Sequence, residues 1–201
     1  MLNVDLIELK EIQLNEFAES LLENALRKSE SEEEYFRRHP KYDWQRLQFG
    51  FSRIKPGKKC LEIGPGRGYL TTILHRSKVF EEIHAIDIVD RTKRLPKDVN
   101  FKIEDVSNLS FTDGEFDTVI CMEVLEHLDT DSYYSALSEI RRVCGGKLIV
   151  TVPFNEPMPS KYHLQSFSSQ RIMDEYPDGK YSLLLKSPIM RVPWLMIEEI
   201  H

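Results

Sequence analysis

From residue 59 onward, short apolar runs alternate along the chain with segments that have a helical pattern. Short apolar runs occur at residues 59–63, 83–88, 101–106, 118–122 and 147–154. Segments with a helical pattern occur at about 69–79, 133–142 and 168–176, between or after these runs. Short apolar runs are typical of strands buried on both faces, as in a parallel sheet covered by helices. The pattern therefore predicts an α/β fold over residues 51–201.

The two ends of the chain have different patterns. Residues 1 to about 34 carry apolar residues near a helical period among many acidic ones, which predicts an amphipathic helical appendage. We expect residues 1–50 to form a helical cap or lid segment. At the other end, extended runs at 181–185 and 192–200 predict a final antiparallel hairpin. A helix that begins with Pro193 at its first position remains an alternative for the last run.

The connection after the run at 83–88 is unusually short. Residues 91–98 contain a proline and several cations, and they lead directly into the next apolar run. Parallel neighbouring strands normally need a connection of a dozen or more residues. We expect a single helical turn here, with its basic side chains in solvent.

A turn with glycine at every second position follows the first apolar run. Gly64, Gly66 and Gly68 suit a backbone with positive φ angles and allow a ligand to approach without a Cβ in the way. A helix begins directly afterwards, so its unpaired N–H groups would face the turn. In the dinucleotide-binding fingerprint two residues separate the last two glycines, whereas here one residue does.

Carboxylates stand at the ends of the next two apolar runs. Asp87 lies about twenty residues beyond the glycines, where it can accept hydrogen bonds from both hydroxyls of a ribose. Asp90 is a weaker candidate for the same role. Asp105 ends the run at 101–106. Ligands of open α/β sheets bind outside the carboxyl ends of the strands, so these positions predict a ligand-binding site.

The order of these motifs resembles that of the class I, Rossmann-like S-adenosylmethionine-dependent methyltransferases, in particular a small-molecule group of the "type 11" kind. The resemblance rests on Glu62-x-Gly64-x-Gly66-x-Gly68, on Asp87 and Asp105, and on the strand that leads into Glu-Val-Leu-Glu-His-Leu at 123–128. It covers roughly residues 35–170.

The resemblance implies a fold, a cofactor and a set of site residues. The fold is a doubly wound, seven-stranded, mostly parallel sheet with an antiparallel last strand and helices on both faces. The cofactor is S-adenosylmethionine, which leaves as S-adenosylhomocysteine. The expected cofactor-binding residues are Glu62, Gly64, Pro65, Gly66, Gly68, Asp87, Ile88, Asp105, Val106, Met122 and Glu123. Asp105 would accept a hydrogen bond from the adenine amino group. Tyr35, Tyr42, Trp44 and Arg46 either cover the cofactor or pack a connecting helix.

Two histidines are candidate acid–base catalysts. His127 follows the fourth strand, and His163 belongs to a His-x(3)-Phe-Ser feature common in the resembling enzymes. A histidine near neutral pKa can accept a proton from an acceptor hydroxyl or amine. Either histidine could instead only brace its loop, and Glu123 is a weaker candidate. Because a sulfonium already activates its methyl group, we expect alignment of the acceptor to dominate catalysis and no metal to be needed.

Composition and motifs limit the chemical class of acceptor and the cellular location that we expect. A formal net charge of -6 and a pI near 5.6 argue against general nucleic-acid binding. The Asp/Asn-Pro-Pro-aromatic tetrad of enzymes that methylate amino groups of nucleobases is absent from the sequence. So is the Pro-Cys pair of enzymes that methylate pyrimidine rings. We expect an oxygen, nitrogen or carbon acceptor on a small molecule or sugar. The sequence shows neither a long apolar span nor a secretory signal pattern, so we expect a cytoplasmic protein, with a homodimer possible.

Three other expectations remain. Cys60, Cys121 and Cys144 lack metal-site spacing and are expected to be buried, reduced thiols. A non-catalytic binding or assembly protein on the same fold would keep the nucleoside site and lack a base. An NAD(P)-dependent oxidoreductase is the less favoured alternative because of the glycine spacing.

Overall fold

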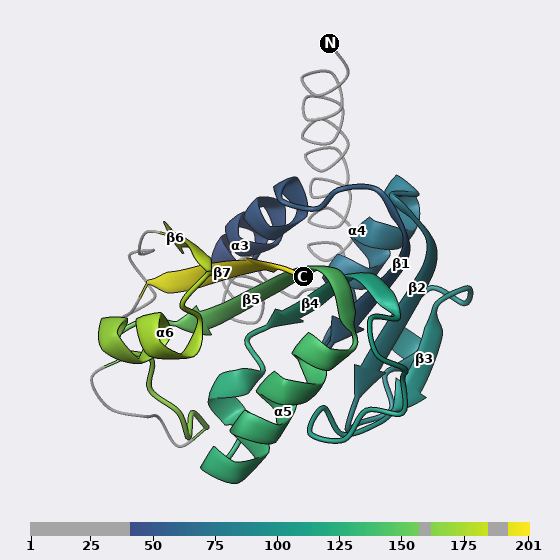
Figure 1. Cartoon of the computed structure of the whole chain (residues 1–201). Coiled ribbons are helices and arrows are strands. Elements are labelled where there is room, and N and C mark those ends of the chain that lie inside the picture. Colours follow the sequence, from purple (N-terminus) through teal and green to yellow (C-terminus); the bar gives the residue numbers. More distant parts are fainter. Residues whose placement is uncertain (1–40, 157–161, 185–192) are drawn as a thin grey trace. The chain divides into compact units, whose positions relative to one another are not determined.

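The computed structural model describes residues 41–156, 162–184 and 193–201 (Figure 1). The chain divides into two units between Lys55 and Pro56. The first unit contributes helix α3, Lys41–Ser52. The expected helical appendage at 1–34 and Tyr35 lie outside the described residues, as do the side chains of Tyr42 and Trp44. The cap and its role therefore stay predictions.

The second unit is built on a seven-stranded sheet in the order β3-β2-β1-β4-β5-β7-β6 (Figure 1). Its strands are β1 Gly57–Ile63, β2 Phe80–Asp87, β3 Asn100–Ile103, β4 Phe116–Met122, β5 Cys144–Pro153, β6 Lys180–Leu184 and β7 Trp194–Ile200. The first five strands pair in parallel, and β7 lies antiparallel between β5 and β6. The predicted fold class is confirmed.

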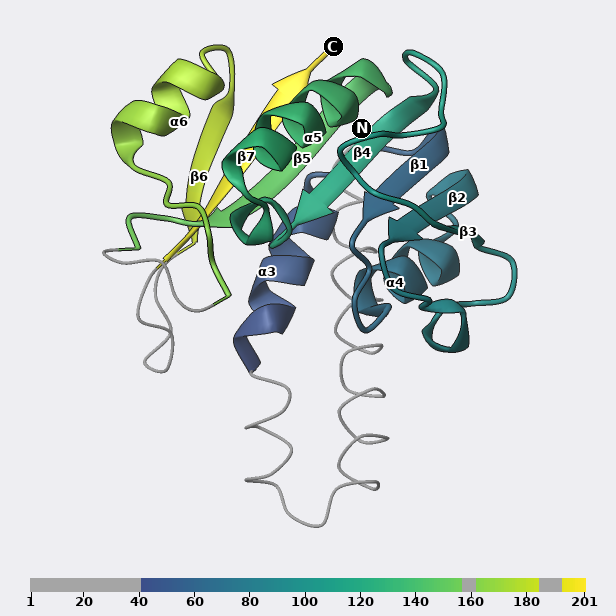
Figure 2. The ribbon, with the colours of Figure 1, turned by 90° about the horizontal axis from the view of Figure 1, so that it is seen from below.

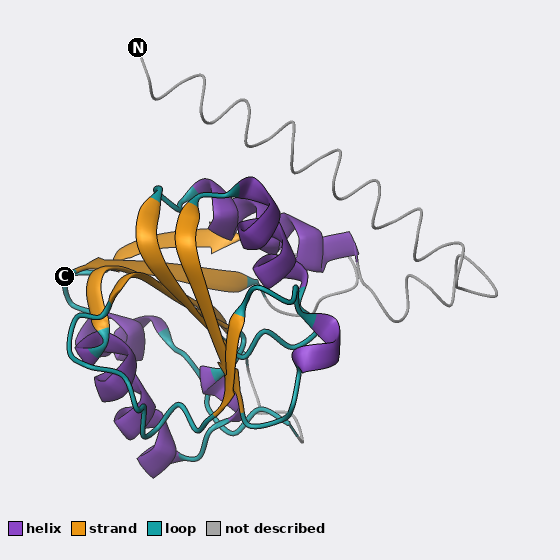
Figure 3. Cartoon of the chain, turned by 90° about the vertical axis from the view of Figure 1, so that its right-hand side faces the viewer, coloured by secondary structure: helices purple, strands orange, loops and turns teal. Residues whose placement is uncertain are grey.

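Helices cover both faces of this sheet. Helix α4, Tyr69–Ser77, connects β1 to β2, and α5, Thr130–Arg142, connects β4 to β5. The two connections run in opposite directions along the sheet, so right-handed crossovers place α4 and α5 on opposite faces (Figures 2 and 3). Helix α6, Ser169–Glu175, contributes to the same core cluster as α5. Among the described helices, none has both the length and the apolar character that crossing a membrane requires.

The short connection between β2 and β3 contains one 3₁₀ turn, η1, Thr92–Arg94, as expected. A second 3₁₀ turn, η2, Leu125–His127, follows β4. Several strands begin or end at residues other than those the sequence pattern predicts, and β5 is one of them. We expected β5 to begin at Lys147 and residues 144–146 to end the preceding helix, but β5 begins at Cys144, which pairs with Phe116.

The reason for the longer β5 is the close approach of two backbones. A Cβ at Gly146 would lie 2.4 Å from the carbonyl oxygen of Asp117, so the glycine permits a contact that a side chain would block. At the other end of the chain, β7 pairs with both β5 and β6. The hairpin is therefore the correct alternative, and a helix beginning at Pro193 is wrong.

Alternation along β1 divides its side chains between the two faces. Leu61 and Ile63 belong to the core cluster that also contains Tyr133 and Ile140 of α5. The intervening Glu62 is 5% exposed and accepts a hydrogen bond from Thr71 of α4, at 2.5 Å. The carboxylate thus ties β1 to the helix that follows the glycine turn.

All three cysteines are free and buried, as predicted. Burial raises the pKa of the Cys60, Cys121 and Cys144 thiols, so the folded state keeps their protons. Unfolded thiols ionise near pH 8.5, and the unfolded state then binds fewer protons than the folded one. The free energy of unfolding should therefore fall above about pH 8.5, by up to about 1.4 kcal/mol per pH unit for each thiol.

Urea unfolding at pH 7.5 and 9.5 measures this loss. The Cys121→Ala variant should lose less stability between the two pH values than the wild type, whatever its stability at pH 7.5. The structure indicates that burial keeps the Cys121 thiol protonated at pH 9.5. Equal losses of stability in the two proteins would contradict this.

Candidate functional site

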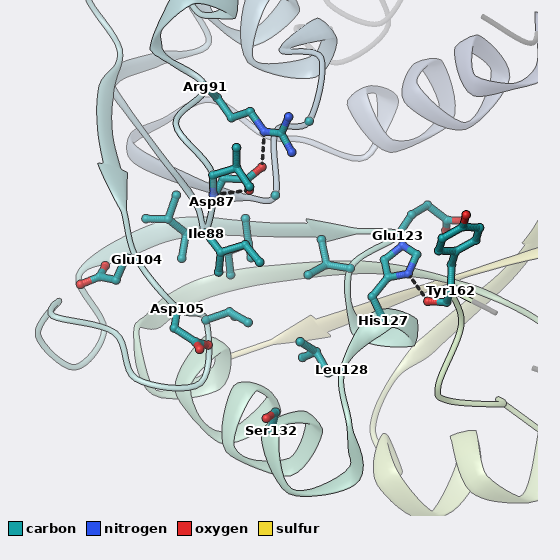
Figure 4. A pocket seen from close by; sticks show the side chains of 17 residues that line it. Asp87, Ile88, Arg91, Glu104, Asp105, Glu123, His127, Leu128, Ser132 and Tyr162 are labelled. Atoms are coloured by element: carbon teal, nitrogen blue, oxygen red, sulfur yellow. Dashed lines mark hydrogen bonds and ion pairs between the residues drawn. The ribbon is translucent and has the colours of Figure 1, made fainter. Parts of the chain in front are cut away.

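A cavity of about 670 Å³ lies at the carboxyl ends of β1, β2 and β4 (Figure 4). Its lining includes Ile63 and Gly64 from β1 and the turn, Asp87 and Ile88 from the end of β2, and Val124 after β4. Connections leave β1 and β4 in opposite directions, so this is the switch point at which ligands bind in open α/β sheets. The volume is within the range of about 300–1,000 Å³ found for small-molecule sites.

The glycine turn forms part of the cavity wall. Gly64, Gly66 and Gly68 all have positive φ angles, of 67°, 53° and 76°. The Gly64 N–H donates to the carbonyl oxygen of Ile86 at 2.8 Å, which joins the turn to the end of β2. Gly64 and Gly66 line the cavity, whereas Gly68 lies outside the lining.

Asp87 presents its carboxylate at the end of β2. Its side chain is 9% exposed, and Oδ2 accepts a hydrogen bond from Nε of Arg91 at 2.8 Å (Figure 4). Oδ1 accepts from the backbone N–H of Val89 at 3.0 Å. Each carboxylate oxygen has two lone pairs, so both can accept a further hydrogen bond from a hydroxyl. We expected the Arg91 side chain to lie in solvent, but it pairs with Asp87. The spacing of four residues between the two was the signal in the sequence that could have predicted this pair.

Asp105 lies on the same cavity, two residues after β3. Its Oδ1 accepts from the backbone N–H and the hydroxyl of Ser107, both at 2.8 Å, which fixes the carboxylate. The backbone N–H of Glu104 donates to the carbonyl oxygen of Asp87 at 3.1 Å and thereby joins the two strand ends. Figure 4 shows Asp87, Ile88 and Asp105 on one side of the cavity. Val106 also lines it.

Five of the predicted site residues lie outside the cavity lining. They are Glu62, Pro65, Gly68, Met122 and His163. Glu62 points to α4 because the strand alternation places it on the face opposite Leu61 and Ile63. Its observed contact supports the turn from outside the cavity.

Two carboxylates and two imidazoles lie close together beside the cavity, and we call Glu126, His127, Glu156 and His163 the rim cluster; His127 lines the cavity, and the other three lie outside its lining. His127 belongs to η2 and lines the cavity with Glu123 and Tyr162, opposite Asp87 and Asp105 (Figure 4). The rings of His127 and His163 lie 5.1 Å apart between centroids. The carbonyl oxygen of Glu126 accepts from the N–H groups of Leu164 and Gln165, at 2.6 and 3.1 Å, which holds the two segments together.

Sequence reasoning named both histidines but did not bring them together. They are 36 positions apart in the chain, and hydrogen bonds between the segments that carry them bring them together, at the carbonyl oxygens of Glu126, Tyr162 and Leu128. Glu126, Glu156 and Tyr162 were missed as neighbours. Glu123 was predicted and lines the cavity; it has a φ angle of 55° and accepts a hydrogen bond from the Thr151 hydroxyl at 3.0 Å.

Comparison with known proteins identifies related sequences. Residues 34–187 match the family described as "Methyltransferase domain". The Ubiquinone biosynthesis O-methyltransferase of Xanthomonas axonopodis pv. citri is 28% identical over 147 residues, which cover 68% of this chain and 59% of that protein. The chain thus spans about three fifths of the length of this curated relative.

Solved structures share the fold at low sequence identity. The 1,6-didemethyltoxoflavin-N1-methyltransferase of Burkholderia thailandensis, solved with 1,6-didemethyltoxoflavin and S-adenosylhomocysteine, has a TM-score of 0.61 and 16% identity, and the match covers 92% of this chain and 89% of that one. The complex described as "Complex between the Haloferax volcanii Trm112 methyltransferase activator and the putative methyltransferase" contains a chain with a TM-score of 0.64 and 17% identity, and the match covers 84% of this chain and 92% of that one. At these identities the likeness shows the fold alone.

Proposed function

This chain belongs to the methyltransferase domain family of S-adenosylmethionine-dependent proteins, and from this premise we propose that it transfers a methyl group to an oxygen of a small molecule. The observation that carries the proposal is the cavity at the switch point of the sheet, with Asp87 and Asp105 on one side and His127 on the other. The carboxylates suit a nucleoside, and the opposite side is left for the acceptor.

The residues of the cavity fit the cofactor. Asp87 has hydrogen-bonding capacity left for two ribose hydroxyls, and Asp105 is held in a fixed position by Ser107. Gly64 and Gly66 leave the turn without Cβ atoms where the ligand would lie. The cofactor supplies a methyl group already activated by a sulfonium. The protein must hold the acceptor in line and exclude water, and alignment of this kind contributes several kcal/mol, up to about 7–11 kcal/mol.

Two points support oxygen as the acceptor atom: the name of a curated relative, and the titratable groups on one side of the cavity. The curated relative is called an O-methyltransferase, and this supports an oxygen acceptor here. A hydroxyl needs help to lose its proton near neutral pH, and the side of the cavity opposite the carboxylates carries titratable groups that can give this help. A phenol or an enol fits this arrangement better than an aliphatic alcohol, because its oxygen ionises at a lower pH.

Two measurements test the proposed function. Calorimetry should show S-adenosylhomocysteine binding with a dissociation constant in the micromolar range, and mass spectrometry should detect a gain of one methyl group on a phenolic or enolic acceptor in a panel that also contains amines and carbon acids. Absence of cofactor binding would overturn the proposal. Binding without transfer to any acceptor would favour a non-catalytic binding protein, and a fluorescence change with NADH alone would favour an oxidoreductase.

A further inference from the structure

We propose that Glu126, His127 and His163 bind a divalent first-row transition-metal ion at the acceptor side of the cavity. The proposal deepens the proposed function and rests on it for the role of the ion, but the binding of the ion can be tested separately. The sequence analysis expected no metal, and the arrangement of the rim cluster is what changes this expectation.

The first argument is the hydrogen bonding of the two imidazoles. Nδ1 of His127 lies 2.6 Å from the carbonyl oxygen of Tyr162. A carbonyl oxygen can only accept, so Nδ1 carries the hydrogen and Nε2 of a neutral ring carries the lone pair. Nδ1 of His163 lies 2.7 Å from Oε2 of Glu156, and a carboxylate imposes the same tautomer. Each ring therefore presents Nε2 as its metal-binding nitrogen.

This pattern is the usual one for histidine metal ligands. A ligating histidine almost always donates its other N–H to a carboxylate or a backbone carbonyl, which fixes the ring. The rim cluster contains one example of each partner, Glu156 for His163 and the Tyr162 carbonyl for His127. Two imidazoles that merely pack together would not need both tautomers fixed in this way.

The second argument is the convergence of three ligand atoms. One ligand atom each from Glu126, His127 and His163 can be chosen so that all lie within 4.8 Å of one another. Nε2 of His127 is 3.9 Å from Oε1 of Glu126. Metal bonds of about 2.1 Å bring ligand atoms to about 3–3.5 Å from one another, so small side-chain rotations would close the site.

The third argument is the environment of the carboxylate. The Glu126 side chain is 1% exposed, whereas that of His127 is 47% exposed. Removing a carboxylate from water is costly unless it is paired or coordinates a metal. A buried carboxylate beside two imidazoles on a partly open rim provides three protein ligands and leaves further positions for a small molecule.

The donor set selects the kind of ion. Two nitrogens and one carboxylate suit zinc, manganese, iron or cobalt in the divalent state, whereas magnesium and calcium favour oxygen ligands. The ion would bind the acceptor hydroxyl and lower its pKa. The hydroxyl proton then leaves to solvent, the oxygen forms a bond to the methyl carbon, and the electron pair of the broken carbon–sulfur bond stays on sulfur. The products are the methylated oxygen and S-adenosylhomocysteine.

Cobalt provides a readout that does not depend on activity. The full-length protein, treated with a chelator and then titrated with Co²⁺, should develop visible absorption bands that saturate at one ion per chain. Zn²⁺ added afterwards should displace the cobalt and remove the bands. Absence of the bands together with no heat of Zn²⁺ binding would overturn the proposal.

Three variants locate the ion. His163→Ala should lower Zn²⁺ affinity by about 100-fold or more, and Glu156→Gln by about 10-fold, since it removes only the partner of a ligand. His75→Ala is the matched control, because His75 also pairs with a carboxylate, Asp98, at 3.3 Å but on α4. It should leave Zn²⁺ affinity unchanged. Equal affinity in all three variants and the wild type would contradict the assignment.

S-adenosylhomocysteine binding separates this proposal from the proposed function. His163 lies outside the cavity lining, so His163→Ala should bind S-adenosylhomocysteine within about 3-fold of the wild type, which also shows that it folds. Cofactor binding and methyl transfer that survive complete chelation would overturn the role of the ion in the reaction while supporting the methyltransferase. Metal binding in a protein that does not bind S-adenosylhomocysteine would keep the metal site and overturn the proposed function.

Discussion

The Asp87→Ala variant is expected to bind S-adenosylhomocysteine about 100-fold more weakly than the wild type. The carboxylate is positioned at the end of β2 by Val89 and Arg91, and it has lone pairs left for two ribose hydroxyls. Hydrogen bonds to a charged group contribute about 1.5–3 kcal/mol each, so the loss of two corresponds to a factor of 100 or more. Isothermal titration calorimetry measures the change.

Asp90→Ala is the matched control for this experiment. Asp90 lies three residues further along, and its carboxylate accepts from the N–H and hydroxyl of Thr92 outside the cavity lining. We expect its affinity for S-adenosylhomocysteine to remain within about 2-fold of the wild type. If Asp90→Ala weakened binding as much as Asp87→Ala, the ribose site would have to be moved to the loop after β2.

The Gly68→Ala variant is expected to show the largest loss of stability among single substitutions in the glycine turn. A Cβ at this position would lie 2.6 Å from the carbonyl oxygen of Arg94, which is backbone and cannot rotate away. The residue also has a φ angle of 76°. The strained φ contributes about 1–2 kcal/mol and the overpacking about 1–3 kcal/mol, so we expect a loss of about 3 kcal/mol. For a chain of this size that corresponds to a decrease in Tm of about 6–12 °C.

Gly66→Ala separates the two causes. Gly66 also has a positive φ, of 53°, but the nearest atom to an added Cβ is 3.9 Å away. Its loss of stability should be only about 1–2 kcal/mol, from the backbone alone. Thermal unfolding of both variants tests this, and similar Tm values for the two would show that the contact between the turn and Arg94 does not exist in solution.

The pattern of apolar runs predicted the sheet well because its central strands are buried on both faces. Such strands are nearly continuous in apolar residues, as in residues 147–154, and their order follows from the family resemblance. The start of β5 was missed because Cys144, Gly145 and Gly146 have no strand signal of their own. Their extended conformation depends on the backbone of Gly114 and Asp117, which local sequence does not reveal.

The part of the site that follows directly after buried strands could also be predicted from the sequence. Asp87 and Asp105 stand directly after apolar runs, and strand ends of a parallel sheet meet at one edge, so their convergence on a cavity could be inferred. Glu62 shares the motif but faces α4, because alternation within the strand decides its direction. The rim cluster joins residues 126–127 with Glu156 and with residues 162–165 through loop contacts, and no periodicity in the sequence encodes such contacts.

The location of the cofactor is tested most directly by a crystal structure of the full-length protein with S-adenosylhomocysteine. The account predicts that the ribose hydroxyls lie within hydrogen-bonding distance of the Asp87 carboxylate, that the adenine lies beside Asp105, and that the sulfur is directed toward His127 and Tyr162. A nucleoside bound elsewhere, or in this cavity without contact to either aspartate, would contradict it.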